Sequence, residues 1–411
     1  NSVQRNDANT FQASLLPSQT TPFPYSEIVS RVDNLAGGSI SQNGNTQSAT
    51  ATASLAGNLI SAGSSTSIGN IQANAAILNT QSNVNTDVMA KVENARQSVT
   101  VGIASPSATI SGSVSLNDNS IQASTEGNVA ASSLNLKASN LAVGGNGTGL
   151  VALVPTTNSA TSGLSASVLS LQSNDALNLT SENKGSSITA NFNEQGLTPA
   201  NLPVSASQVS VNSNSLTALA TANSTSNALN LTASTASGLN AGLGNSQYLT
   251  GHDVTVESET TFIPSAIAAS AGVSGTPLSV AITAAGVSGS QLSLNSNELT
   301  AAAKGNTASN NITVNAVNAS GLPVASGGLF ATVKPISQAS DANGASGAKA
   351  NADFALVNAQ ADNGTQLSAS LFASNKITTT TVGPGSALSA SSNQQSATGT
   401  VNSSSKALNQ N

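Results

Sequence analysis

The chain has 411 residues, of which 7% are charged and 2% aromatic, and its formal net charge at pH 7 is −6. A globular domain normally has about 25% charged residues. The compact core of a chain of 411 residues would also normally contain more large aromatic side chains than this chain provides, since it has no Trp. The absence of Cys excludes disulfides and thiolate metal sites. Eleven scattered Lys and Arg form no basic stripe, so we expect no nucleic-acid partner.

Residues 1–35 differ in composition from the rest of the chain. They hold three of the twelve prolines and a third of the nine Phe and Tyr residues, namely Phe11, Phe23 and Tyr25. Proline is disfavoured in a central strand because it lacks an N–H. Two interpretations follow: an extended arm that docks on a neighbouring subunit through these aromatic side chains, or a cap folded over the first coil of the chain's own array.

Residues 36–411 carry short runs in which apolar and polar residues alternate, with Asn43-Gly44 as a typical turn signal. The stretch 84–97 also has Val88, Val92 and Ala95 at helical spacing, but the same stretch alternates and strands surround it, which favours a strand. No composition shift divides this region. We therefore predict an all-β fold, an elongated β-solenoid-like array of short strands, with residues 36–411 as one continuous array.

Similar text recurs along this array. Each copy reads as strand, turn and strand, with Gly305-Asn306 as the turn of the clearest one. The copies cover residues 114–138, 169–192, 209–233 and 292–318. Four asparagines occupy the same place in them and predict a degenerate unit of about 40 residues: Asn119, Asn174, Asn214 and Asn297.

Stacked coils place like residues over like residues, so asparagine amides can hydrogen-bond along the stack. We interpret the four asparagines as positions of such a ladder or of a fixed turn. A solenoid also has two open edges, and each edge can template another strand. An uncapped end that meets an unlike end gives a head-to-tail contact, which extends into a filament when it does not close.

A resemblance agrees with this interpretation. The segments Ile40–Asn45 (ISQNGN) and Ile121–Asn128 (IQASTEGN) resemble the short Gln-, Asn-, Gly-, Ser- and Ala-rich repeats of bacterial secreted fibre proteins of the curlin, functional-amyloid type. The repeats here are longer than in that family. The resemblance implies a self-assembling subunit of a biofilm matrix or surface appendage. It also implies an extracellular location. The first candidate partner is another copy of the chain, and the second is cell-surface or matrix polysaccharide.

Catalytic residue patterns are sparse. The chain has one His, so the Ser-His-Asp type of triad has a single candidate base, and no phosphate-binding glycine loop occurs. The acidic group around His252 and Asp253 is better explained as a solvated strand face than as a metal site. We expect no enzyme activity, cofactor or metal. The alternatives to a filament subunit are a monomeric adhesin stalk and an ice- or carbohydrate-binding solenoid.

The sequence contains no run of 18 apolar residues, so we predict no transmembrane helix. The first residue is Asn1 rather than Met. Removal of a secretory signal would leave such an end, and so would an end chosen for expression.

Overall fold

Strands dominate the protein. The computed structural model describes residues 2–16, 26–32, 35–63, 70–71, 75–101, 110–142, 150–153, 158–162, 166–192, 203–237, 241–250, 253–258, 278–283, 286–320, 329–333, 346–350, 354–363, 366–379 and 381–410. No helix occurs in these ranges, which confirms the all-β prediction. The stretch 84–97 lies in two strands, β7 (Ala75–Glu93) and β8 (Ala95–Val101), with Asn94 between them.

Four parallel sheets contain most of the strands. The first pairs β5 (Thr46–Gly63), β6 (Asn70–Ile71), β10 (Ser120–Ala142), β16 (Ser215–Ser237), β22 (Glu298–Ser320) and β30 (Gln394–Gln410). The second contains β1 (Ser2–Asp7), β2 (Thr10–Leu15), β7 (Ala75–Glu93), β13 (Ala166–Lys184), β17 (Ala241–Thr250), β18 (Asp253–Ser258), β25 (Phe354–Asn363) and β26 (Gln366–Leu371).

The other two parallel sheets are shorter. One contains β3 (Ser26–Val32), β8 (Ala95–Val101), β14 (Ser187–Phe192), β19 (Leu278–Thr283) and β27 (Ala373–Thr378). The other contains β4 (Ala36–Ser41), β9 (Ile110–Ser115), β15 (Pro203–Ser210), β20 (Gly286–Ser288), β21 (Gln291–Ser293), β28 (Thr381–Val382) and β29 (Ala387–Ser389). A separate antiparallel sheet is formed by β11 (Leu150–Leu153), β12 (Asn158–Ser162), β23 (Leu329–Val333) and β24 (Ser346–Ala350).

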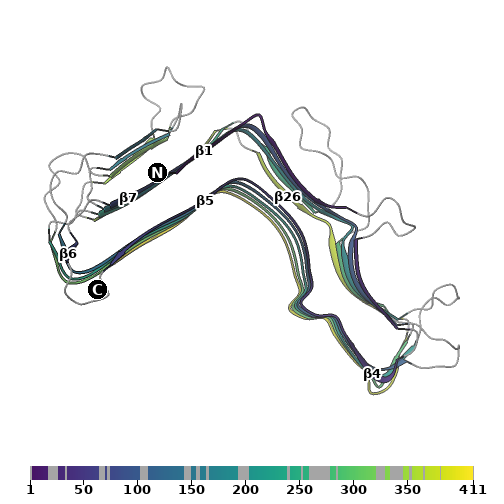
Figure 1. Ribbon diagram of the computed structural model, residues 1–411. Helices are drawn as coiled ribbons and strands as arrows, with labels where there is room; N and C mark the ends of the chain where they lie inside the picture. The colour runs from purple at the N-terminus through teal and green to yellow at the C-terminus, as the bar shows by residue number, and fades with distance from the viewer. Residues whose placement is uncertain are drawn as a thin grey trace.

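The described part of the chain runs through the four parallel sheets five times, in register. Ser120, for example, pairs with Thr46 of the pass before it and with Ser215 of the pass after it. Figure 1 shows the result as two long layers, in which the strands of each sheet lie beside one another from purple to yellow. Every pass is therefore covered by its neighbours, except for the first and the fifth.

The distance in sequence between stacked residues corrects the predicted unit of about 40 residues. Asn45, Asn119, Asn214, Asn297 and Asn393 stack in turn, at separations of 74, 95, 83 and 96 residues. One pass crosses both facing layers, and the strands of the two layers have similar amino-acid sequences. The copy at 169–192 lies in β13 and β14, opposite the layer that holds the other three copies.

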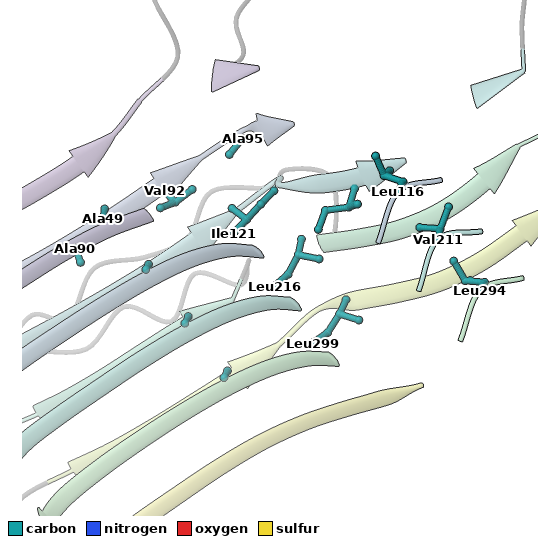
Figure 2. Packing of buried hydrophobic residues seen from close by; sticks show 14 of the residues in the cluster. Ala49, Ala90, Val92, Ala95, Leu116, Ile121, Val211, Leu216, Leu294 and Leu299 are labelled. Atoms are coloured by element: carbon teal, nitrogen blue, oxygen red, sulfur yellow. The ribbon is translucent and has the colours of Figure 1, made fainter. Parts of the chain in front are cut away.

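The core lies between the two layers and consists of columns of aliphatic side chains. Alternate residues of each strand point inward, as the period of two requires. In Figure 2 one column contains Ile121, Leu216 and Leu299, all fully buried, and small residues such as Ala49 and Ala90 also line the cluster. Like residues lie over like residues because the register between passes is maintained.

The predicted turn at Gly305-Asn306 is wrong, because β22 runs without a break from Glu298 to Ser320. Glycine has a different role at this position. A Cβ on Gly305 would overlap the main-chain oxygen of Val401 in the next pass, and a Cβ on Gly127 would overlap that of Ala222. These glycines therefore allow close approach between passes, which is the other common reason for glycine inside a strand.

Residues 1–35 belong to the sheets. Here β1 and β2 pair in parallel with β7, while β3 pairs in parallel with β8. Phe11 is partly buried and packs against the core cluster, whereas Phe23 and Tyr25 lie outside the described residues. The described part of this segment is thus the first pass through the sheets.

Candidate assembly surfaces

A three-residue corner connects the short sheet of β9, β15 and β21 to the long sheet of β10, β16 and β22. Its sequence is Asn-x-Asn in the first four passes and Ser-Ser-Asn, residues 391–393, in the fifth. The middle residue has a positive φ in every pass: Gly44 at 68°, Asp118 at 57°, Ser213 at 55°, Ser296 at 55° and Ser392 at 55°. Short polar residues and glycine tolerate this left-handed conformation best. The corner is therefore a fixed turn that is repeated at the same point of each pass.

The last residue of each corner is an asparagine, and these asparagines form a column that we name the corner column. Asn119, Asn214 and Asn297 are its buried members. The Nδ2 of Asn119 donates to the Oδ1 of Asn214 at 3.1 Å, and the Nδ2 of Asn214 donates to the Oδ1 of Asn297 at 3.0 Å. Each Nδ2 also donates to a main-chain oxygen of the preceding pass, such as Leu116 O from Asn214 at 2.9 Å. Asn45 and Asn393 continue the column into the first and fifth passes.

The fourth predicted asparagine, Asn174, lies in the facing layer and not in the corner column. It stacks on Asn83 at 2.9 Å, accepts from Asn128 at 2.8 Å and donates to Asn223 at 2.8 Å. Asn128 and Asn223 come from the opposite layer, so these amides connect the two layers across the core. All four side chains are fully buried.

A glutamine column, which the sequence analysis missed, runs through all five described passes. It contains Gln4, Gln81, Gln172, Gln247 and Gln360. Each Nε2 donates to the Oε1 of the preceding glutamine, at 2.9, 2.8, 2.8 and 2.6 Å in turn. The recurrent text Gln-x-Asn at Gln81–Asn83 and Gln172–Asn174 is the signal that could have identified it.

Each glutamine also binds the facing layer. The Nε2 atoms donate to main-chain oxygens of Leu55, Val129, Ser224, Thr307 and Ser403, at 2.7, 2.8, 2.9, 2.7 and 3.0 Å. Both hydrogens of each inner amide are therefore used. A buried amide must be satisfied in this way to avoid a desolvation penalty.

The stack has two open faces, which we name rims. The first-pass rim is formed by β1 to β5, and the fifth-pass rim by β25 to β30. Among the strands that the structure describes, β5 and β30 end their sheet: β5 pairs with β10 and with no earlier pass, and β30 pairs only with β22. One side of each rim strand therefore presents main-chain N–H and C=O groups that no described strand pairs.

Among the residues whose side chains the structure describes, the large apolar side chains that are strongly exposed all lie at these rims. They are Val3, Leu16, Val29, Leu55, Leu59, Phe372, Val382, Leu388 and Val401, with exposed fractions from 40% to 70%. All nine lie on rim strands or next to them. The surface between the rims is polar by comparison, so the rims are the surfaces best suited to association.

A small network of charged side chains lies on the outer face of β7 and β13. Lys91 contacts Glu93 at 3.3 Å and Glu182 at 3.4 Å, and Lys184 contacts Glu93 at 3.7 Å. Burial opposes the charge on Lys91, but Glu182 and Glu93 together raise the pKa of Lys91 above its usual value. Adjacent passes thus place opposite charges side by side.

Metal-binding side chains do not cluster in the part of the chain that the structure describes: it contains no group of three or more His, Asp or Glu. His252 lies outside the described residues, and Asp253 begins β18. Within the same residues no helix is long and apolar enough to span a membrane.

Comparison with protein families, with curated proteins and with solved structures finds no match to this chain.

Proposed function

We propose that this chain is a β-solenoid whose copies join head to tail into an extracellular filament, where it acts as a structural subunit of a surface appendage or biofilm matrix. The observation that carries the proposal is the pair of rims. Each rim presents strands with one edge that no described strand pairs, together with exposed apolar side chains, while the column amides and the core apolar side chains of the inner passes are buried. A second copy is the partner that supplies parallel strands of the same length.

The composition supports a structural role. Columns of identical residues tolerate Asn, Gln, Ser and aliphatic side chains, whereas columns of like charges repel. A chain with 7% charged residues fits this requirement. The resemblance of short segments to secreted fibre proteins supports the extracellular location. We assign the chain no catalytic role and no cofactor.

Filament formation is tested with the purified full chain. Sedimentation velocity over a range of concentrations should show growth beyond the monomer, and negative-stain electron microscopy should show thin unbranched fibres. Fibre diffraction should give a reflection at about 4.7–4.8 Å along the fibre axis, since the strands lie across the axis. A chain that stays monomeric at every concentration would contradict the proposal.

A second candidate is a monomeric adhesin stalk or a carbohydrate- or ice-binding solenoid. It rests on a shallow groove of about 280 Å³ on the sheet of β9, β15 and β21. Hydroxyl and amide groups of Ser115, Gln208, Ser210, Gln291 and Ser293 line this groove, and such groups can hydrogen-bond to sugar hydroxyls. Retention on immobilised polysaccharide by a strictly monomeric protein, or inhibition of ice growth by it, would favour this candidate.

A further inference from the structure

We infer that the fifth-pass rim of one copy docks on the first-pass rim of the next in the same register as the internal passes, so that Asn393 lies on Asn45 and Gln360 on Gln4. The inference rests on the proposed function and specifies its junction. The partner is a second copy of this chain, and the contact is one more layer of the same stack.

At each rim the glutamine column ends with one hydrogen-bonding group that no described residue pairs: a hydrogen of the Gln4 Nε2 at the first-pass rim, and the Oε1 of Gln360 at the fifth-pass rim. At the first-pass rim the Nε2 of Gln4 donates to Leu55 O alone, so one of its two hydrogens has no acceptor among the described residues. At the fifth-pass rim the Nε2 of Gln360 donates twice, but its Oε1 accepts from no described residue. Gln4 of a second copy would donate to this oxygen and continue the column.

The corner column ends in the same way, with the opposite direction of donation. Within the column the main-chain N and Nδ2 of each asparagine donate to the Oδ1 of the next, as Asn297 does to Asn393 at 3.0 Å. The Oδ1 of Asn45 accepts from no described residue. Asn393 of the preceding copy would donate to it through both nitrogens, so the two columns are satisfied by the same docking.

The register of the internal passes also aligns similar sequences across the junction. It places residues 393–400 (NQQSATGT) over residues 45–52 (NTQSATAT), and six of these eight positions are identical. The strands that lie between them differ more: β10 and β22 have Ile121 and Leu299 where the two rims have Gln47 and Gln395. It also places Ala369–Leu371 over Ala13–Leu15, both Ala-Ser-Leu.

Charges agree with this docking. Seven charged residues lie on the described rim strands: Arg5, Asp7, Glu27 and Arg31 on the first-pass rim, and Asp362, Lys376 and Lys406 on the fifth-pass rim. In the register of the internal passes none of them lies directly over another charge. Head-to-head docking of two first-pass rims would instead bring two acceptors, the Asn45 Oδ1 atoms, to the same junction and would reverse the strand direction.

The register can be tested by disulfide cross-linking because the chain contains no Cys. Thr50 and Thr398 are both exposed on rim strands and become direct neighbours in the inferred junction. Adjacent strands lie about 4.8 Å apart, which a disulfide can bridge. Within one copy the two positions are four layers apart, about 19 Å by the same spacing, so a disulfide must join two copies.

The matched control is the pair Thr50→Cys with Thr400→Cys, in which the second position is shifted by two residues along the same strand. Its Cα atoms would be about 8 Å apart in the junction, which is beyond the reach of a disulfide. We expect the Thr50→Cys, Thr398→Cys variant to form filaments when reduced and a series of covalent multimers when oxidised. The control should form the same filaments with severalfold less covalent product.

A second measurement covers the case in which cysteines at the rim impair assembly. Gln4→Leu removes the inferred donor to Gln360, while Gln12→Leu makes the same change at an exposed residue of the same rim. We expect Gln4→Leu, and not Gln12→Leu, to raise the monomer concentration that coexists with filaments. Normal filaments with equal cross-linking of both cysteine pairs would overturn the register and leave the proposed function standing. A parent chain that forms no filaments would overturn both.

Discussion

Asn214 and Asn297 lie 83 residues apart in sequence, and the Nδ2 of Asn214 donates a 3.0 Å hydrogen bond to the Oδ1 of Asn297. Both side chains are fully buried. The strands described between them, β16 to β21, form one complete pass through the four parallel sheets. A substitution in the corner column therefore tests directly whether the register between passes stabilises the fold.

The first prediction concerns this column. Asn214→Asp keeps the shape and the acceptor for Asn119, but it removes the Nδ2 that donates to Leu116 O and to the Oδ1 of Asn297, and it buries a charge. We expect a loss of about 3 kcal/mol in the free energy of unfolding, measured by chemical denaturation monitored by circular dichroism. Asn43→Asp is the control. Its Oδ1 accepts from Asn117 N at 2.7 Å at an exposed site, which a carboxylate can also do. Equal losses for both variants would contradict the prediction.

The glutamine column gives the second prediction. Gln172→Leu leaves one of the two hydrogens of the Gln247 Nε2 without an acceptor inside the core, and it leaves the Oε1 of Gln81 with only the long hydrogen bond from Asn79 at 3.4 Å. It also removes the hydrogen bond to Ser224 O. We expect a loss of about 2 kcal/mol or more in unfolding free energy. Gln360→Leu at the rim removes one column hydrogen bond where water can replace it, so we expect less than about 1 kcal/mol from it in the monomer. A larger loss of unfolding free energy for Gln360→Leu than for Gln172→Leu would contradict this prediction.

The third prediction concerns close approach between passes. In Gly127→Ala the new Cβ would overlap Ala222 O and contact the side chain of Leu177, so we expect destabilisation of about 1–3 kcal/mol. Gly57→Ala is the control, since nothing lies within 4 Å of its Cβ position. It should be neutral, or more stable by less than about 1 kcal/mol through the unfolded state. Matching melting temperatures for the two variants would show that the overlap is relieved at no cost.

The fourth prediction is a pH dependence at Asp175. Burial raises the pKa of its carboxyl above the ordinary value. The folded chain therefore binds more protons than the unfolded chain between the two pKa values, and stability falls as pH rises through this window. Asp175→Asn should remove this loss. It should stabilise the protein at pH 7 by less than about 1 kcal/mol, because the group is only part buried.

The measurement for Asp175→Asn is thermal unfolding of the parent and the variant across pH. The difference between them should shrink as pH falls below the unfolded pKa of about 3.9, where both states of the parent are protonated. A difference that grows toward acid pH would have the wrong sign and would reject the explanation by burial.

Strand content could be predicted from the sequence because alternation is a local property. Asn119, Asn214 and Asn297 could also be recognised as equivalent, since their flanking residues are alike. Asn174 could not be separated from them, because both layers of a pass present apolar residues to the same core and so share the same local text. The size of a pass was missed for a related reason: the separations of 74, 95, 83 and 96 residues hide any fixed period.

The part of 1–35 that the structure describes shows a limit of composition. The aromatic residues and prolines of residues 1–35 predict a separate segment, and of these residues the structure describes Phe11, which packs against the core in the first pass. The glutamine column was missed because its members share only the short text Gln-x-Asn, and only in some passes. Which layer a residue joins is decided by pairing between distant strands, and local periodicity does not contain this information.

The core of this fold has a fixed width, because only two layers of side chains meet between the sheets. Additional residues cannot make this core wider and can only add passes to the stack. An isolated molecule should therefore exchange its amide hydrogens fastest at both extremities and slowest in passes two to four, as in other one-dimensional arrays. Such a molecule can therefore increase its free energy of unfolding only by lengthening the stack, either with further passes of the same chain or with a second copy.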